Sequence, residues 1–306
     1  MTAPPSIPSA ATSRSAALSG IGFMLMAVFL FALNSAAGKW LVAKYPIGEF
    51  MLIRSCFTLL LLSPVIWHAG RTAFANAPRP GLQVLRVVLG SVEVAMFFWA
   101  VSYLPLADTT TFYLAGPIYV TALSVLLLRE RVGWRRWTAV LIGFTGVVIA
   151  LRPSSSSFTL PALIALAGSV MYAGVLITTR ALRATNDIVL MTTYFVGAIA
   201  FGLVTLPFGW VAPNAFDLLC LAAVGLSNIV AQFSVIRSLK LASASVVVPY
   251  QYTLIVWSVV FGWLMFAELP DVYTVAGAVV IVAAGLYIFW REQVKAREAV
   301  APAEIP

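Results

Sequence analysis

The segments LRERVGWRRW (residues 128–137) and FAELPDVY (residues 266–273) decide how this chain folds. Each lies between two long apolar runs and contains a glutamate shortly after the first run ends. The first segment has four arginines, whereas the second has two acidic residues and no basic one. If the two segments are equivalent connections, this difference indicates opposite sides of a membrane, because short cytoplasmic loops retain Lys and Arg.

The composition is that of an integral membrane protein. Of the 306 residues, 61% are hydrophobic and 10% are charged, whereas a soluble domain is about half apolar and about one quarter charged. A helical span needs roughly 20 apolar residues to cross the bilayer core. A backbone in lipid must also satisfy its own hydrogen bonds, so long unbroken apolar runs indicate helices rather than barrel strands.

Ten runs are long enough, so we predict an all-α integral membrane protein with ten transmembrane helices. We place these helices near residues 17–39, 47–69, 82–103, 106–128, 134–151, 159–181, 187–208, 216–238, 241–266 and 271–290. Residues 1–16, rich in Pro, Ser and Ala, are predicted to form a disordered cytoplasmic tail, and residues 291–306 a second cytoplasmic tail. The connections between helices are too short for a hidden soluble domain.

The basic residues predict the orientation. With the N-terminus inside, fourteen Lys and Arg residues fall on the inner side, and three, Lys39, Lys44 and Arg152, on the outer side. Arg54 and Arg86 lie within spans. We therefore expect both termini to be cytoplasmic, in a bacterial-type inner (plasma) membrane. The net charge of +8 is explained by basic residues at helix ends, where they meet membrane lipid. No nucleic-acid partner is therefore expected.

The two halves of the chain resemble each other. LPLADTTTF (104–112) aligns with LKLASASVV (239–247) at an offset of 135 residues, and FALNSAAGKWL (31–41) aligns with YAGVLITTRAL (172–182) at an offset of 141. The chain is therefore expected to be one five-helix unit used twice.

Because five is odd, the second unit must enter the membrane from the opposite side. The predicted repeats cover residues 17–151 and 159–290. Glu130 of the arginine-rich segment then matches Glu268 of the acidic one, and the two equivalent connections differ in charge because one is inside and the other outside. Inverted repeats are typical of secondary transporters, which bind substrate near the midplane between the repeats.

Several motifs together resemble a known family. They are LNSAAGK (33–39), LIRS around Arg54, LPLADTTTFYLAGP (104–117), RERVGWRRWTAVLIGFTGVVIALRP (129–153) and VVVPYQYTLIVWSVVFGWLMFAELPDVYTVAGAVVIVAAGLY (246–287). From about Leu18 to Glu292 the chain is similar to the drug/metabolite transporter superfamily, whose members of this size have two five-helix repeats of the EamA kind. The PYQYT and FGWLMFAELPD stretches most resemble a branch with bacterial amino-acid exporters of the YddG type.

This resemblance implies a secondary transporter that exports small metabolites, amino acids first and aromatic ones included, by alternating access. It leaves open a carrier of S-adenosylmethionine, a sugar or a cationic drug. A non-transport membrane protein is the alternative of another class. No catalytic triad, metal motif or phosphate-binding loop is present in the sequence, so an enzyme is not expected, and neither is a cofactor or an obligate protein partner.

Polar residues deep in a span are candidates for the substrate site, because such groups are unfavourable in lipid unless they face a cavity or a partner. Glu93 lies about midway along the third span, and its counterpart at the offset of 135 is Asn228. Gln232 follows one turn later on the same helix face. A structural ion pair of Glu93 with Arg86 or Arg54 is the alternative.

Arg54 has an expected structural partner of its own. Glu49 lies about one turn away in the same predicted span. A structural role for this arginine is therefore at least as well supported as a role in binding.

Tyrosines of the matched fourth and ninth spans are further candidates, because each offers an apolar ring and a hydroxyl to a small amphipathic solute. These candidates are Tyr113, Tyr119, Tyr250 and Tyr252, of which we expect two to face the solute. Asn34, Trp99 and Tyr172 complete the set. Asn34 could instead form a hydrogen bond between helices.

Prolines and glycines in matching spans predict shape rather than chemistry. Pro117 and Pro249 should interrupt the fourth and ninth spans, because proline lacks the backbone N–H. Glycines of the fifth and tenth spans indicate close helix packing; they are Gly143, Gly146, Gly277 and Gly285.

Overall fold

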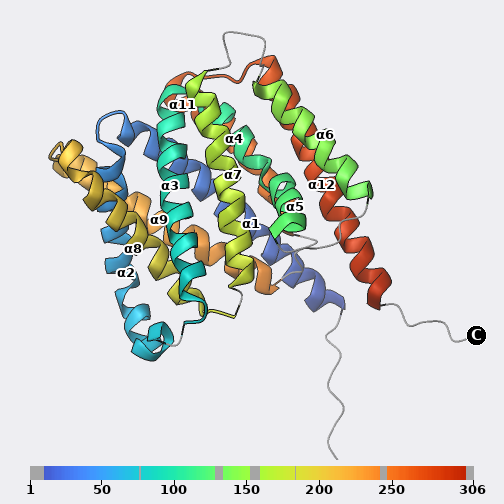
Figure 1. The fold of residues 1–306 in the computed structure, drawn as a ribbon, viewed down its shortest axis with the longest axis horizontal. Coiled ribbons are helices and arrows are strands. Elements are labelled where there is room, and N and C mark those ends of the chain that lie inside the picture. Colours follow the sequence, from blue (N-terminus) through green and yellow to red (C-terminus); the bar gives the residue numbers. More distant parts are fainter. Residues whose placement is uncertain are drawn as a thin grey trace, which may run out of the picture.

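The computed structural model describes residues 10–75, 77–127, 134–151, 159–182, 184–241 and 247–300, which form a bundle of helices (Figure 1). The first half contains α1 Ala10–Val42, α2 Ile47–Ala75, α3 Pro80–Tyr103, α4 Leu106–Leu114, α5 Gly116–Leu127 and α6 Trp134–Leu151. The second half contains α7 Leu160–Ala181, α8 Asp187–Thr205, η1 Leu206–Phe208, α9 Ala215–Leu241, η2 Val248–Thr253, α11 Leu254–Phe266 and α12 Val272–Val300. Glu130 lies outside the described residues.

The predicted all-α membrane fold is confirmed. If α4 with α5, and η2 with α11, are each counted as one span, the described residues form ten spans. Seven helices are long and apolar enough to cross a membrane by themselves, namely α1, α2, α3, α7, α8, α9 and α12. Two shorter apolar helices, Trp137–Leu151 and Tyr250–Phe266, belong to the fifth and ninth spans.

Each divided span contains a proline in the irregular part of its helix. α4 ends at Leu114, and α5 begins at Gly116, one residue before Pro117. A proline cannot donate to the carbonyl four residues earlier, which here is that of Tyr113. The ninth span begins as a 3-10 helix with Pro249 in its first turn. Discontinuous helices at matching places of two repeats are a feature of transporter binding sites.

The helices pack as two inverted repeats. In the repeat order, α7 is the counterpart of α1, and α9 is the counterpart of α3. α1 packs along α9, and α3 packs along α7. These two contacts are equivalent, because exchanging the repeats turns the α1–α9 pair into the α7–α3 pair. The pairs of counterparts also meet: α2 packs on α8, and α6 on α12 at one edge of the bundle (Figure 1). The main helix contacts therefore lie between the repeats.

Glycines allow a close crossing of α6 and α12, as predicted. A Cβ added at Gly277 of α12 would lie 2.6 Å from the carbonyl oxygen of Gly146 on α6, and a Cβ at Gly146 would lie 3.0 Å from that of Gly277. Gly143 similarly makes room for Ile118. Backbone meets backbone at this crossing, so no side chain can move away to accept a larger residue.

The terminal helices are longer than predicted. α1 begins at Ala10, within the 1–16 segment that we expected to be disordered, and α12 continues to Val300 rather than ending near residue 290. Alanine-rich sequence extends an existing helix easily, since each added residue gains a hydrogen bond without a new nucleus. α1 begins and α12 ends at the same end of the bundle (Figure 1).

Candidate functional site

A buried carboxylate lies at a meeting point of both repeats. Glu93 of α3 is only 8% exposed. The hydroxyl of Tyr113 on α4 donates to the backbone oxygen of Glu93 at 3.3 Å. The Tyr113 ring lies 5.9 Å from that of Tyr172 on α7 and 5.0 Å from that of Phe97 on α3, measured between centroids. Two predicted tyrosines and the predicted carboxylate are thus brought together.

Tyr194 of α8 completes this group, and sequence reasoning missed it. The absence of a side chain at Gly90 of α3 gives the ring its place, since a Cβ there would lie 2.7 Å from the ring. The charges of Glu93, Arg54 and Arg86 all act on the Tyr194 phenol. In an apolar run, a tyrosine does not reveal which face of its helix is buried, so no signal distinguished Tyr194. We call Glu93, Tyr113, Tyr172 and Tyr194 the Glu93 cluster.

The expected pairing of Arg54 with Glu49 is wrong. The Glu49 carboxylate accepts a hydrogen bond from the backbone N–H of Val211 at 2.9 Å. Arg54 instead lies near two rings, with its guanidinium carbon 4.9 Å from the centroid of Phe50 and 5.7 Å from that of Phe98. The reason is helical geometry: residues three or four apart face each other, whereas Glu49 and Arg54 are five apart.

Arg86 is not the partner of Glu93 either. Its Nε donates to the Thr179 hydroxyl at 2.7 Å, and one terminal nitrogen donates to the Leu190 carbonyl at 3.0 Å. These bonds join α3 to α7 and α8. Neither Arg54 nor Arg86 forms an ion pair with Glu93 among the residues that the structure describes.

The predicted polar residues of α1 and α9 lie on facing helices. The Ser227 hydroxyl donates to the side-chain oxygen of Asn34, whose amide nitrogen is buried without a hydrogen-bond partner. Gly225 of α9 packs against the backbone of α2 at Arg54. Asn228 follows three residues later, on that same face of α9. Gln232 lies one further turn along this helix and is half-buried.

The remaining aromatic candidates lie in other groups. Tyr119 and Tyr252 belong to the apolar core around α5, α6 and α12, where Tyr252 packs against Gly285. Tyr250 packs with apolar residues of α1. The Trp99 ring lies tilted against that of Tyr103 near the end of α3, with 4.8 Å between ring centroids. The structure therefore does not gather these four around Glu93.

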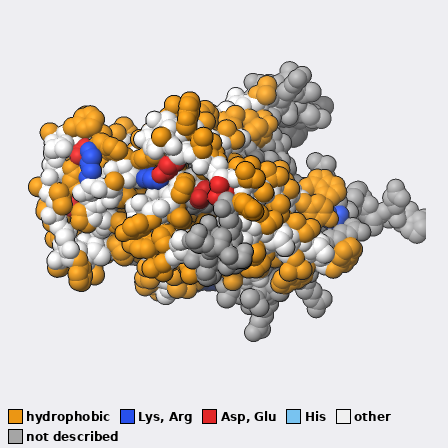
Figure 2. Space-filling view, turned by 90° about the horizontal axis from the view of Figure 1, so that it is seen from above, with side chains coloured by type: hydrophobic (Ala, Val, Ile, Leu, Met, Phe, Trp, Pro, Cys, Tyr) orange, Lys and Arg blue, Asp and Glu red, His pale blue; other side chains and the backbone are white. Residues whose placement is uncertain are grey.

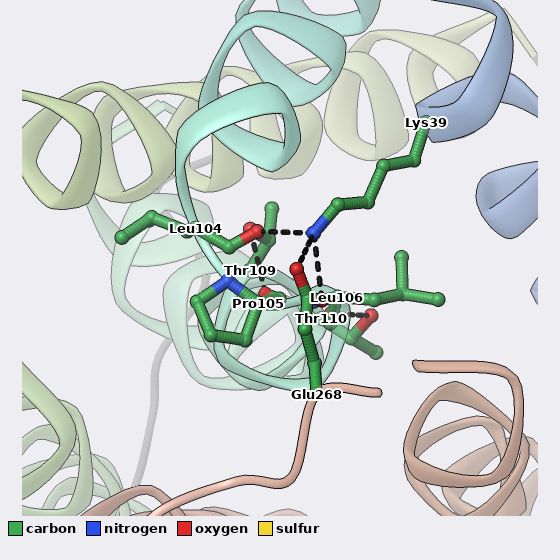
Figure 3. A network of polar contacts seen from close by, with 7 residues as sticks. All are labelled: Lys39, Leu104, Pro105, Leu106, Thr109, Thr110 and Glu268. Carbon is green, nitrogen blue, oxygen red and sulfur yellow. Dashed lines mark hydrogen bonds and ion pairs between the residues drawn. The ribbon is translucent and has the colours of Figure 1, made fainter. Parts of the chain in front are cut away.

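A polar network closes the end of the bundle that the charge rule places outside (Figure 3). Lys39, at the end of α1, donates to both carboxylate oxygens of Glu268, at 2.6 and 2.7 Å, and to the Leu104 carbonyl at 2.8 Å. The backbone N–H of Leu106 also donates to Glu268, at 3.2 Å. The network thus joins α1 and the α3–α4 connection of the first repeat to the α11–α12 connection of the second.

A second polar group bridges the repeats at the same end. The Asp217 carboxylate of α9 accepts hydrogen bonds from Lys44 at 3.3 Å, from the Tyr45 hydroxyl at 2.7 Å and from the Asn214 amide at 3.0 Å. The bond to Asp217 raises the pKa of the Tyr45 phenol above its usual value. Viewed onto this end, the surface is mostly apolar or neutral, and in places an acidic side chain lies beside a basic one (Figure 2).

A cavity of about 180 Å³ opens at this end between α4, α6, α7 and α12. Leu104, Phe112, Ala162 and Thr274 are among its lining residues. None of them belongs to the Glu93 cluster, so this cavity is separate from the candidate site. No cluster of ligands for a metal ion occurs in the part of the chain that the structure describes.

Known proteins resemble the chain over nearly its whole length. It is 27% identical over 279 residues to an S-adenosylmethionine uptake transporter of Rickettsia prowazekii, covering 90% of this chain and 94% of that protein. It is 30% identical over 271 residues to the pseudopaline exporter CntI of Pseudomonas aeruginosa, covering 87% and 94%. A riboflavin transporter of Vibrio cholerae is 27% identical over 285 residues, covering 92% and 96%.

The fold is also known from experiment. A solved crystal structure superimposes with a TM-score of 0.58 at 17% identity, covering 90% of this chain and 97% of the other. The model of the EamA-like transporter family matches the chain twice, over residues 18–152 and 159–290. The chain therefore belongs to the EamA-like transporter family and is a secondary transporter of small metabolites, not an enzyme.

Proposed function

We propose that the chain exports amino acids and related small amphipathic metabolites, aromatic ones included, with the Glu93 cluster as its binding site. The observation that carries this proposal is a buried carboxylate surrounded by tyrosines of both repeats, without an ion-pair partner among the described residues. An ionised carboxylate at mid-membrane is unfavourable by roughly 3 kcal/mol. A solute ammonium, or a proton, would relieve that cost.

The proposed site extends to the facing polar residues of α1 and α9. Asn34, Asn228 and Gln232 would supply amide groups from one side, while the tyrosine rings supply apolar contact from the other. Asn34 supports this assignment because its buried amide nitrogen has a free donor. Tyr119, Tyr250, Tyr252 and Trp99 contribute packing in this account.

Alternating access would be a movement of repeat 17–151 against repeat 159–290. Both salt bridges between described residues, Lys39 with Glu268 and Lys44 with Asp217, lie at the outer end and join the two repeats. This arrangement favours a conformation closed to the outside. With both termini in the cytoplasm of a bacterial-type inner membrane, solute would enter from inside, and the outer network would open to release it.

The relatives limit the chemistry of the solute. The name of one relative indicates uptake and that of another indicates export, so direction is a property of each member. S-adenosylmethionine is itself an amino acid with a cationic centre and an aromatic base. We therefore take S-adenosylmethionine as the second candidate substrate, because a carboxylate among tyrosines suits a cation that also carries a ring.

Counterflow in proteoliposomes tests this proposal. Vesicles with purified protein would be loaded with unlabelled solute, and entry of the labelled solute would be followed for phenylalanine, alanine, S-adenosylmethionine, riboflavin and glucose. Accumulation of phenylalanine or S-adenosylmethionine above protein-free vesicles is expected. Accumulation of glucose or riboflavin alone would refute the proposed substrate class.

A further inference from the structure

Two arginines lie inside membrane-spanning helices, and their surroundings differ. Arg86 donates hydrogen bonds to Thr179 and to the Leu190 carbonyl, so neighbouring helices satisfy it. Arg54 is only 7% exposed, yet it donates no hydrogen bond to any described residue, and its Nε is buried without a partner. No described carboxylate lies within ion-pair distance of it.

Such a cation needs an anionic partner. A guanidinium carries five N–H donors in one plane. Burying it without hydrogen bonds is strongly unfavourable, and natural proteins pair buried charges. Arg86 shows how a buried arginine with a structural role is satisfied in this chain, namely by hydrogen bonds to neighbouring helices. Arg54 lacks such a partner among the described residues, so its buried Nε–H is left available to a bound molecule.

The neighbouring rings hold Arg54 in place without using its hydrogen bonds. Its guanidinium interacts with the faces of Phe50 and Phe98, whose centroids are 4.6 Å apart. Both rings approach Gly38 of α1, where an added Cβ would collide with Phe98 and lie 3.2 Å from Phe50. Contact with ring faces leaves the N–H edge of a guanidinium available for two parallel bonds to a carboxylate.

We propose that Arg54 binds the carboxylate of the transported solute while Glu93 binds its ammonium, so the site selects zwitterions with an amino-acid head group. The charges of Arg54 and Glu93 act on each other, but the two residues do not form an ion pair. A solute with only a negative charge would be repelled by Glu93. A solute with only a positive charge would leave Arg54 without a partner. A head group with both charges satisfies both residues.

This inference rests on the proposed function and adds the second charged contact. The apolar part of the solute would then lie against Tyr113 and Tyr172, whose rings adjoin Glu93. Recognition of the head group by two charges and of the remainder by adaptable rings would allow amino acids of different size to share one site.

The test measures binding to purified full-length protein as the ligand-induced rise in melting temperature. The probes are L-phenylalanine, phenethylamine, which lacks the carboxylate, and 3-phenylpropionate, which lacks the ammonium; S-adenosylmethionine and its decarboxylated form make a second series. Wild-type protein is expected to bind each amino acid about tenfold or more tightly than an analogue that lacks one of the two head-group charges, as a charged hydrogen-bond pair supplies that much. Arg54→Gln should lose the preference over the amine, and Glu93→Gln the preference over the acid.

Two further variants separate binding from folding. Arg54→Lys keeps the charge but lacks the planar fork, so it should bind the zwitterion less tightly than wild type and more tightly than Arg54→Gln. Arg86→Gln should lower the melting temperature of the free protein while keeping the preference for zwitterions. An Arg54→Gln protein that still prefers the amino acid tenfold over its amine would overturn the inference. If wild type binds none of the probes, the proposed function fails; if it binds them without preferring zwitterions, only this inference fails.

Discussion

The Lys39 ammonium lies 2.6 Å from a carboxylate oxygen of Glu268, which is 229 positions later in the chain. This ion pair joins the end of α1 in the first repeat to the α11–α12 connection in the second (Figure 3). It also adjoins the site, because Gly38, the preceding residue, contacts Phe98 and Phe50 beside Arg54. We interpret it as a contact that holds the outer face closed and must break in each transport cycle.

Breaking this contact should open the outer face. A reporter cysteine at Ser35, one turn before Lys39, would be placed in a variant in which Cys56 and Cys220 are replaced by serine. Lys39→Met should increase its rate of labelling by an impermeant thiol reagent added outside. The exchanged pair Lys39→Glu with Glu268→Lys should return the rate toward that of the parent, since the attraction is restored. Equal rates in all three proteins would show that the ion pair does not control access.

The proposed orientation has a direct test. Single cysteines at Thr72, near the end of α2, and at Val272, at the start of α12, are both at exposed sites at opposite ends of the bundle. In intact cells, an impermeant reagent should label the cysteine at Val272 and not the one at Thr72, because the positive charges place Thr72 inside. Labelling with the opposite preference would reverse the topology and with it the direction of the cycle.

Tyrosine variants should distinguish residues of the binding site from residues of the apolar core. Tyr172→Ala removes a ring beside Glu93 and should weaken transport of phenylalanine more than that of alanine, since the lost contact is mostly apolar area. Tyr250→Ala, in the apolar group of α1, is the matched control and should leave the ratio of the two transport rates unchanged. The comparison uses kcat/KM for both solutes in vesicles. A ratio that changes only in Tyr250→Ala would place the site elsewhere.

The α6–α12 crossing should not tolerate a methyl group. Gly277→Ala would place its Cβ 2.6 Å from the backbone of Gly146, so the helices must separate. We expect a loss of about 1–3 kcal/mol in the free energy of unfolding, the usual effect of overpacking. Gly22→Ala serves as the control because nothing lies within 4 Å of its added Cβ. Similar unfolding midpoints in detergent for both variants would argue against this packing.

Much of the fold could be predicted because membrane insertion constrains each span separately. Every helix must satisfy its own backbone and be long enough to cross the bilayer, so apolar runs reveal the spans. The difference in charge between the two loops then indicates inversion. The side chains of the binding site are harder to predict from sequence, because no comparable constraint acts on them. Glu93 could be found because a mid-span carboxylate is rare, but Tyr194 could not, since a tyrosine is compatible with core, lipid interface and cavity alike.

Pairing was the other failure of prediction. Proximity along the chain suggested Glu49 as the partner of Arg54, yet the two residues do not face each other on the helix, and Glu49 bonds to Val211 instead. The partner of Arg86 lies instead in a distant segment, since its Leu190 contact spans 104 positions. Such contacts depend on how the repeats pack, which no single segment encodes.

The central claim is that solute crosses at the Glu93 cluster, and counterflow with a Glu93→Gln protein tests it most directly. No described cation forms an ion pair with Glu93, so this change should leave the melting temperature within a degree or two of wild type, whereas Arg86→Gln, which loses interhelical bonds of about 1 kcal/mol, should lower it. Counterflow of labelled phenylalanine or S-adenosylmethionine should fall about tenfold or more in Glu93→Gln vesicles. Wild-type counterflow by folded Glu93→Gln protein would contradict the account.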